Sequence, residues 1–171
     1  MRSRVVFTHN PVALPLKKRA LRGRRLVVVD IENVIGGAVM ASEQASSAHL
    51  SIEDAVGLAA TEQVVIGTSH IGVLATGLGW RGPRIVVRSG ENGADLALLE
   101  VLTDERVEER FDEVVLVSGD GIFTEAVGAL GALGVQVTVV SRGDSLSKRL
   151  RLAAGRTVLL NYSAISVGGA A

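Results

Sequence analysis

Six short aliphatic runs, each followed by a longer segment, set the pattern of hydrophobic and polar positions along the chain. The runs cover residues 26–30, 64–68, 84–88, 113–118, 135–140 and 157–160. They are rich in Val, Leu and Ile and show little polar alternation within each run. Runs of this length and composition are typical of strands that are buried on both faces. The pattern therefore predicts a sheet of six buried strands.

The intervening segments predict helices. Apolar residues at helical spacing and glycine stop signals place helices at residues 51–62, 70–78, 95–110, 123–133 and 145–154. Ser51 and Asp54 resemble a capping box, whereas residues 38–49 show no firm period and indicate a loop or a weak helix. Strands that alternate with helices imply crossover connections and a mainly parallel sheet. We expect one α/β domain with three layers, α/β/α.

The amino-acid composition excludes several kinds of binding site and catalytic chemistry. Aromatic residues make up 3% of the chain, so the core must be aliphatic and stacking of nucleobases on aromatic rings is disfavoured. The absence of cysteine excludes disulfides, zinc–thiolate sites and thiol catalysis. No apolar stretch approaches the ~18 residues of a membrane span, and no signal-peptide core is evident. We expect a cytoplasmic protein without a membrane partner. The sequence also allows a homo-oligomer.

The net charge of zero hides an asymmetry. Residues 1–25 contain eight of the 18 Lys and Arg residues and no acid, which leaves ten bases against 18 acids in the remainder. We therefore divide the chain into a basic, flexible arm over residues 1–25 and a folded domain over residues 26–171. The arm is either a handle for a polyanion or a leader that keeps the chain soluble and folds back on the acidic body.

Three carboxylates stand at comparable places in the pattern. Asp30 ends the first strand, Asp120 follows the fourth, and Asp95 opens the helix after the third strand. Parallel strands bring such positions to one edge of a sheet. Each acid also has a purely structural explanation, since Asp is favoured in turns and in the first turn of a helix. Together the three predict an acidic cluster.

Repulsion within such a cluster points to a metal ion. Two unit charges ~5 Å apart at an effective dielectric of ~20 oppose each other by about 3 kcal/mol. Oxygen ligands favour Mg²⁺ or Mn²⁺, which can activate water for hydrolysis of a phosphodiester. Four residues near these acids carry polar groups that we expect to bind the substrate: Asn33, Ser118, Gly119 and Gly121.

Over residues 25–161 the chain resembles the NYN domain, a branch of the PIN-like nuclease superfamily. The resemblance depends on three motifs: Asp30-Ile-Glu32-Asn33, Gly93-Ala94-Asp95, and Ser118-Gly119-Asp120-Gly-Ile-Phe123. It implies a PIN-like, Rossmann-like fold and a metal-dependent ribonuclease or RNA-processing module. It also implies that Asp30, Asp95 and Asp120 form the metal-binding and catalytic cluster, with Asn33 beside it.

One position departs from the family motif. Ile122 occupies the place of the second acid, and Glu32 or Asp144 are the candidates to replace it. A non-catalytic RNA-binding module is therefore an alternative to the nuclease. A haloacid-dehalogenase-like phosphatase is a second alternative, but it requires an Asp-x-Asp motif and a lysine between the third and fourth strands. The chain has Glu32 instead, and no lysine lies between Lys18 and Lys148.

Overall fold

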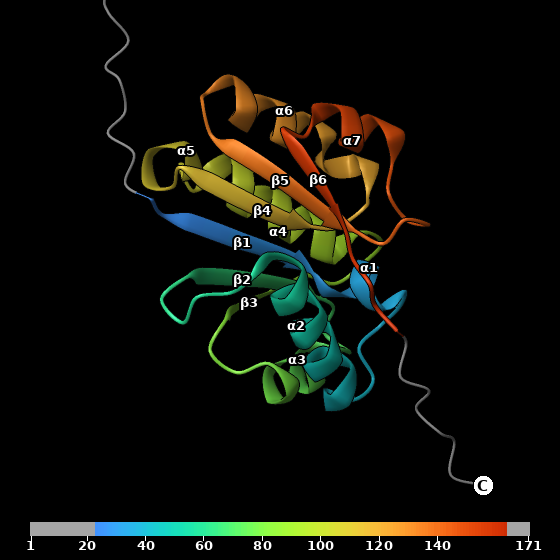
Figure 1. Cartoon of the computed structure of the whole chain (residues 1–171). Coiled ribbons are helices and arrows are strands. Elements are labelled where there is room, and N and C mark those ends of the chain that lie inside the picture. Colours follow the sequence, from blue (N-terminus) through green and yellow to red (C-terminus); the bar gives the residue numbers. More distant parts are fainter. Residues whose placement is uncertain (1–22, 164–171) are drawn as a thin grey trace, which may run out of the picture.

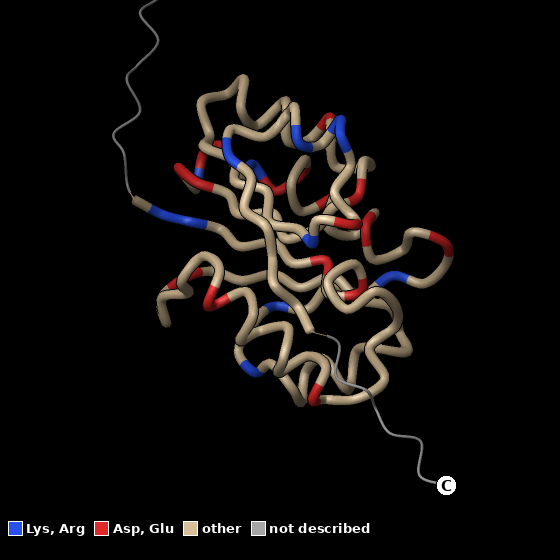
Figure 2. Tube along the Cα trace, turned by 45° about the vertical axis from the view of Figure 1, so that its right-hand side comes forward, with Lys and Arg blue, Asp and Glu red and all other residues tan. Residues whose placement is uncertain are grey.

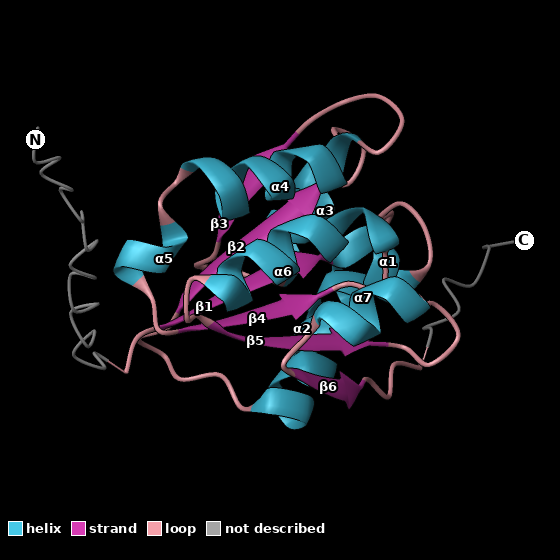
Figure 3. Ribbon diagram, turned by 90° about the horizontal axis from the view of Figure 1, so that it is seen from above, coloured by secondary structure: helices cyan, strands magenta, loops and turns pink. Residues whose placement is uncertain are grey.

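The computed structural model describes residues 23–163 and contains one six-stranded sheet with helices on both faces (Figure 1). All neighbouring strands are parallel, in the order β3-β2-β1-β4-β5-β6 (Figure 3). The strands are β1 (Arg25–Asp30), β2 (Gln63–Thr68), β3 (Arg84–Val87), β4 (Glu113–Val117), β5 (Gln136–Ser141) and β6 (Arg156–Leu159). The expected three-layer α/β/α architecture is confirmed, and the sheet is parallel throughout.

The strands form because their residues fill two aliphatic layers. In β1, Leu26 and Val28 face one layer, while Val27 and Val29 face the other. Helices α4 (Gly93–Asp104), α6 (Thr124–Ala132) and α7 (Lys148–Ala153) cover the first layer. Helices α1 (Ile31–Ile35) and α2 (Ser42–Val56) cover the second, and α3 (Val73–Gly79) packs beside α2. Burial on both faces explains why each strand appears as an unbroken apolar run.

The helix boundaries differ from the prediction in the segment before β2. Helix α2 already begins at Ser42, so Ser51 lies inside the helix and does not start it, and the helix ends at Val56. Ala45, Ala48 and Ile52 are fully buried at helical spacing, and this apolar face packs the helix against the sheet. The Gln44 side chain accepts hydrogen bonds from the backbone N–H groups of residues 40 and 41 and caps the start.

The predicted helix over residues 95–110 is two helices. Arg106 adopts a left-handed backbone conformation, with φ of 51°, between α4 and α5 (Val107–Arg110). After this turn, Val107 and Phe111 are buried in the core. The basic helix also begins later than predicted, at Lys148, and the short α1 was not predicted.

The strand order reverses direction at β1. From β1 the chain adds β2 and β3 on one side, and it then returns to add β4, β5 and β6 on the other. The carboxyl ends of β1 and β4 therefore meet at a topological switch point, where open parallel sheets bind their ligands. Asp30 is the last residue of β1 at this point.

Gly67 determines how closely α4 approaches that edge. It pairs with Asp30 across β1 and β2. A Cβ at Gly67 would lie 2.5 Å from Cγ of Leu98 and 3.1 Å from the carbonyl oxygen of Ala94. The missing side chain lets the first turn of α4, which carries Asp95, lie directly over the end of β1.

Replacing Gly67 tests this contact. Gly67→Ala is expected to lower the free energy of unfolding by about 1–3 kcal/mol, because the added methyl overpacks the sheet against α4. Gly128→Ala is the matched control, since Gly128 is exposed in α6 with no atom within 4 Å of the added Cβ. It is expected to raise stability by about 0.5–1 kcal/mol. Urea denaturation measures both, and equal effects would contradict the proposed packing.

Candidate functional site

The three predicted acids meet at the carboxyl edge of the sheet. Asp30, Asp95 and Asp120 all line one shallow cavity of about 220 Å³. Glu32 and Asn33 line the same cavity. The remaining lining residues are Ser69, Arg88, Gly90, Asn92, Gly93 and Ala94. We call this cavity the acidic notch. None of its lining residues is a lysine, so it does not supply the lysine that the phosphatase alternative requires.

Asp30 is the most buried acid of the notch, at 3% exposure. It forms the N-cap of α1, where its Oδ1 accepts a hydrogen bond of 3.1 Å from the Asn33 N–H. Its Oδ2 accepts a hydrogen bond of 2.9 Å from the Ser118 hydroxyl. Burial, followed by repulsion from Asp95, raises the pKa of Asp30 from 3.8 to about 8. At neutral pH the carboxyl of Asp30 therefore holds a proton.

Asp95 interacts directly with Asp30. Burial raises the pKa of Asp95, a hydrogen bond to Asp30 lowers it, and the charges of Asp120 and Glu32 raise it. The same hydrogen bond raises the pKa of Asp30, so a proton on this pair is favoured on Asp30. Four acids thus stand close enough to repel one another, and one proton relieves the strongest repulsion.

The turn after β4 is held by internal hydrogen bonds. Asp120 caps the short helix η1 (Gly121–Phe123), where its Oδ1 accepts from the Ile122 N–H at 2.9 Å. The Ser118 hydroxyl oxygen accepts from the Asp120 N–H at 3.2 Å. The Gly119 N–H donates to Asn33 Oδ1 at 2.9 Å. In this structure Ser118 and the Gly119 N–H therefore bind groups of the protein itself, and the substrate-binding role that the sequence predicts for them stays a prediction.

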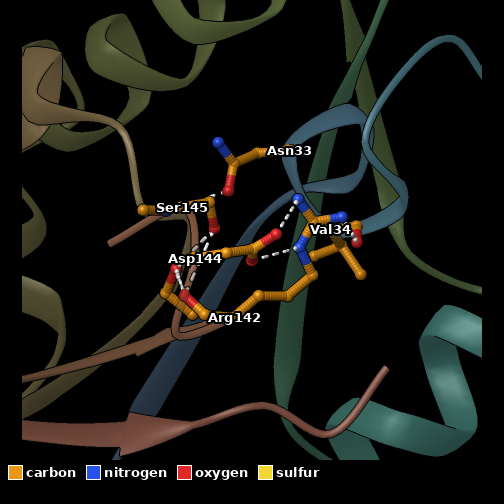
Figure 4. A network of polar contacts seen from close by, with 7 residues as sticks. Asn33, Val34, Arg142, Asp144 and Ser145 are labelled. Carbon is orange, nitrogen blue, oxygen red and sulfur yellow. Dashed lines mark hydrogen bonds and ion pairs between the residues drawn. The ribbon is translucent and has the colours of Figure 1, made fainter. Parts of the chain in front are cut away.

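Asn33 has a fixed orientation. Because its Oδ1 accepts from the Gly119 N–H, its amide NH₂ group is the part that stays available as a donor (Figure 4). Asn33 lies on α1, whose last turn is held by Arg142 from the end of β5. The guanidinium of Arg142 donates to the Val34 carbonyl oxygen at 3.3 Å and pairs with Asp144 at 3.1 Å (Figure 4).

The sequence did not identify Arg142 as part of the site. Its one signal was its position directly after the fifth strand, at the same edge as the acids. The structure also removes Asp144 as a substitute ligand. Asp144 is 76% exposed in its side chain, pairs with Arg142 and does not line the acidic notch. Ile122 packs against the aliphatic core, so no side chain at its position faces the acids.

Glu32 connects α1 to β2. Its Oε1 accepts hydrogen bonds from the Ser69 N–H at 2.8 Å and from the Thr68 hydroxyl at 3.2 Å. Within residues 23–163, no group of three or more His, Cys, Asp or Glu side chains already has a geometry that could hold a metal ion. The hydrogen bonds of Asp30, Glu32 and Asp120 explain this, because they direct carboxylate oxygens toward the protein.

A parallel α/β domain with acids gathered at its switch point is the class of protein that these observations define. The chain belongs to the NYN domain family, which matches residues 70–161. This family is a branch of the PIN-like nuclease superfamily. The matched region contains Asp95 and Asp120, and the segment from Asp30 to Asn33 lies before it.

Two individual proteins are similar to the chain. The low amplitude and bright protein LabA of Synechococcus elongatus is 43% identical over 53 residues, which is 31% of this chain and 28% of LabA. A crystal structure of a protein of unknown function from Vibrio parahaemolyticus has a TM-score of 0.52 at 19% identity. That likeness covers 81% of this chain and 93% of the other, and it supports the fold. No helix in residues 23–163 is long and apolar enough to cross a membrane.

The proton on Asp30 predicts a pH dependence of stability. The folded protein keeps the proton on Asp30 up to a pKa of about 8, whereas the unfolded chain loses it near 3.8. The stabilisation is complete below 3.8 and is lost as the pH rises toward 8. In EDTA the free energy of unfolding should fall by up to about 1.4 kcal/mol per pH unit in this range.

Urea denaturation at several pH values measures this slope. Asp30→Asn should remove this component of it, since the amide does not titrate. Glu91→Gln, at an exposed acid outside the notch, should keep it. An unchanged slope in Asp30→Asn would show that Asp30 does not hold the proton.

Proposed function

We propose that the protein is a metal-dependent ribonuclease that hydrolyses RNA phosphodiesters at the acidic notch. The observation that carries the proposal is the gathering of Asp30, Asp95 and Asp120, with Glu32, around one notch, where burial and mutual repulsion raise the pKa of Asp30 and Asp95. A divalent cation relieves the same repulsion that the proton relieves, and oxygen donors suit Mg²⁺ or Mn²⁺. The membership of the NYN domain family supports RNA as the substrate.

Each residue of the notch has a role in this proposal. Asp30, Asp95 and Asp120 hold the ion, and Glu32 is a further candidate ligand. When bound, the ion lowers the pKa of a water molecule and stabilises charge on the phosphate. The amide NH₂ of Asn33, fixed by the Gly119 N–H, donates to a phosphate oxygen. The Gly121 N–H lies on the same turn and is a second candidate donor.

A binding module without hydrolysis is the second candidate. Two observations favour it: Ile122 replaces an acid of the family motif, and the acids of residues 23–163 do not stand in a ready metal-binding geometry. Under this alternative the basic arm and the folded domain bind RNA, and the acids serve as caps.

Residues 1–22 of the arm lie outside the described residues, so the division of the chain at residue 25 stays a prediction. A cytoplasmic location and a homo-oligomer also stay predictions.

Cleavage of a labelled single-stranded RNA tests the proposal. We expect cleavage in Mn²⁺ or Mg²⁺ that stops in EDTA and returns when the metal is restored. Asp120→Asn should lower the rate by about 100-fold or more, because it removes a ligand charge while keeping the cap oxygen. Asp144→Asn, the control at an exposed acid outside the notch, should leave the rate within a few-fold of the wild type.

Two results would contradict the nuclease. If purified protein binds the RNA but never cleaves it in either metal, the binding module is the better account. If cleavage persists in EDTA or in Asp120→Asn at the wild-type rate, the activity does not come from the notch.

A further inference from the structure

Most cations of the folded domain are neutralised by an acid or stacked on a ring. Six of the described arginines form ion pairs: Arg25–Glu62, Arg84–Glu105, Arg88–Glu100, Arg106–Glu109, Arg110–Glu105 and Arg142–Asp144. The guanidinium of Arg24 lies over the Phe111 ring, 5.3 Å from its centroid. The acids of these six pairs reduce the positive field of their arginines at the surface.

Helix α7 carries three of the five remaining cations of residues 23–163, and the other two are Arg81 and Arg156. Lys148, Arg149 and Arg151 are exposed, and none of them forms an ion pair within residues 23–163. Residues 145–163 contain no Asp or Glu. Figure 2 shows basic positions in the upper part of the domain, where Figure 1 places α6 and α7, with acidic positions beside them. We call Lys148, Arg149 and Arg151 the α7 cations.

The geometry of the helix presents these cations outward. Leu150 is fully buried and packs α7 against the core. At about 100° per residue, Lys148 points roughly opposite to Leu150, and Arg149 and Arg151 lie on either flank. Leu152 is 81% exposed, one turn after Lys148. The outer surface of α7 thus presents the exposed apolar side chain of Leu152 together with the positive charges of the α7 cations.

The start of α7 touches the turn that carries Asp120. The Ser147 N–H donates to the Gly119 carbonyl oxygen at 2.8 Å. A Cβ at Gly121 would lie 3.0 Å from Ser147 Oγ, so the residue before the helix packs directly on this turn. The α7 cations therefore begin beside the acidic notch.

We infer that α7 binds the phosphates of a single-stranded RNA segment adjoining the phosphodiester held at the notch. This inference rests on the proposed function. The four acids of the notch repel a polyanion, so the α7 cations next to the notch determine where the strand runs. The helix is roughly 9 Å long, which suits a few nucleotides. Leu152 offers an apolar contact to a base, and bases are accessible in single strands.

Fluorescence anisotropy with a short, labelled, single-stranded RNA in EDTA measures this binding without cleavage. The test variant of the full chain combines Lys148→Ala, Arg149→Ala and Arg151→Ala. The control variant removes the same number of exposed charges that have no ion pair within residues 23–163 and combines Arg24→Ala, Arg81→Ala and Arg156→Ala. All six side chains are exposed, and alanine favours the helix in the test variant, so both variants should fold, which circular dichroism checks.

The test variant should bind RNA at least about 10-fold more weakly than the wild type, and the slope of log Kd against log salt should fall by about 2, as expected for three lost phosphate contacts. The control variant should stay within a few-fold of the wild type. Equal losses in both variants would indicate a diffuse charge effect and overturn the inference. Preferential binding of a duplex of the same sequence, or displacement by an acidic peptide at equal charge, would also overturn it.

Cleavage kinetics separate this inference from the nuclease. If the test variant raises KM with little change in kcat, α7 binds the substrate and does not act in the chemical step. If the wild type binds RNA through α7 but cleaves nothing in Mn²⁺, the binding surface stands and the nuclease fails. If the test variant binds and cleaves like the wild type, the nuclease stands and the α7 inference fails.

Discussion

The electrostatic repulsion between Asp30 and Asp95 determines which charged or protonated states the acidic notch can adopt. Asp30 is almost fully buried at the end of the central strand, and Asp95 meets it from the first turn of α4. Burial and this repulsion raise the pKa of both carboxyls, which favours a proton on the pair. A bound cation would relieve the same repulsion, and this exchange links the stability of the domain to its proposed chemistry.

Much of the surrounding structure serves to hold the acids together. Gly67 lets α4 approach, and Gly93 does the same at the start of that helix, where a Cβ would lie 2.3 Å from the Arg88 carbonyl oxygen. Ser118 joins Asp30 to the turn after β4, and Asn33 joins α1 to the same turn. Backbone packing and hydrogen bonds therefore bring the acids together at one place, but within residues 23–163 their carboxylate oxygens do not yet stand in a metal-binding geometry.

The sheet and the three acids could be predicted from the sequence because each depends on a local pattern. A run such as Val27–Val29 indicates a buried strand, and parallel strands bring their carboxyl ends to one edge. The start of α2 could not be predicted in this way, because alanines at 45 and 48 give a weak hydrophobic signal. The roles of Arg142 and Ser118 depend on contacts between residues 88 or more positions apart, which no local pattern contains.

The measurement that tests the central claim most directly is the number of protons released when the metal binds. Titration of the protein with Mn²⁺ near pH 7, by calorimetry in two buffers of different ionisation enthalpy, gives this number. With the pKa of Asp30 raised to about 8, the account predicts release of close to one proton per ion in the wild type and almost none in Asp30→Asn. Binding of the ion without proton release, or no binding at all, would contradict it.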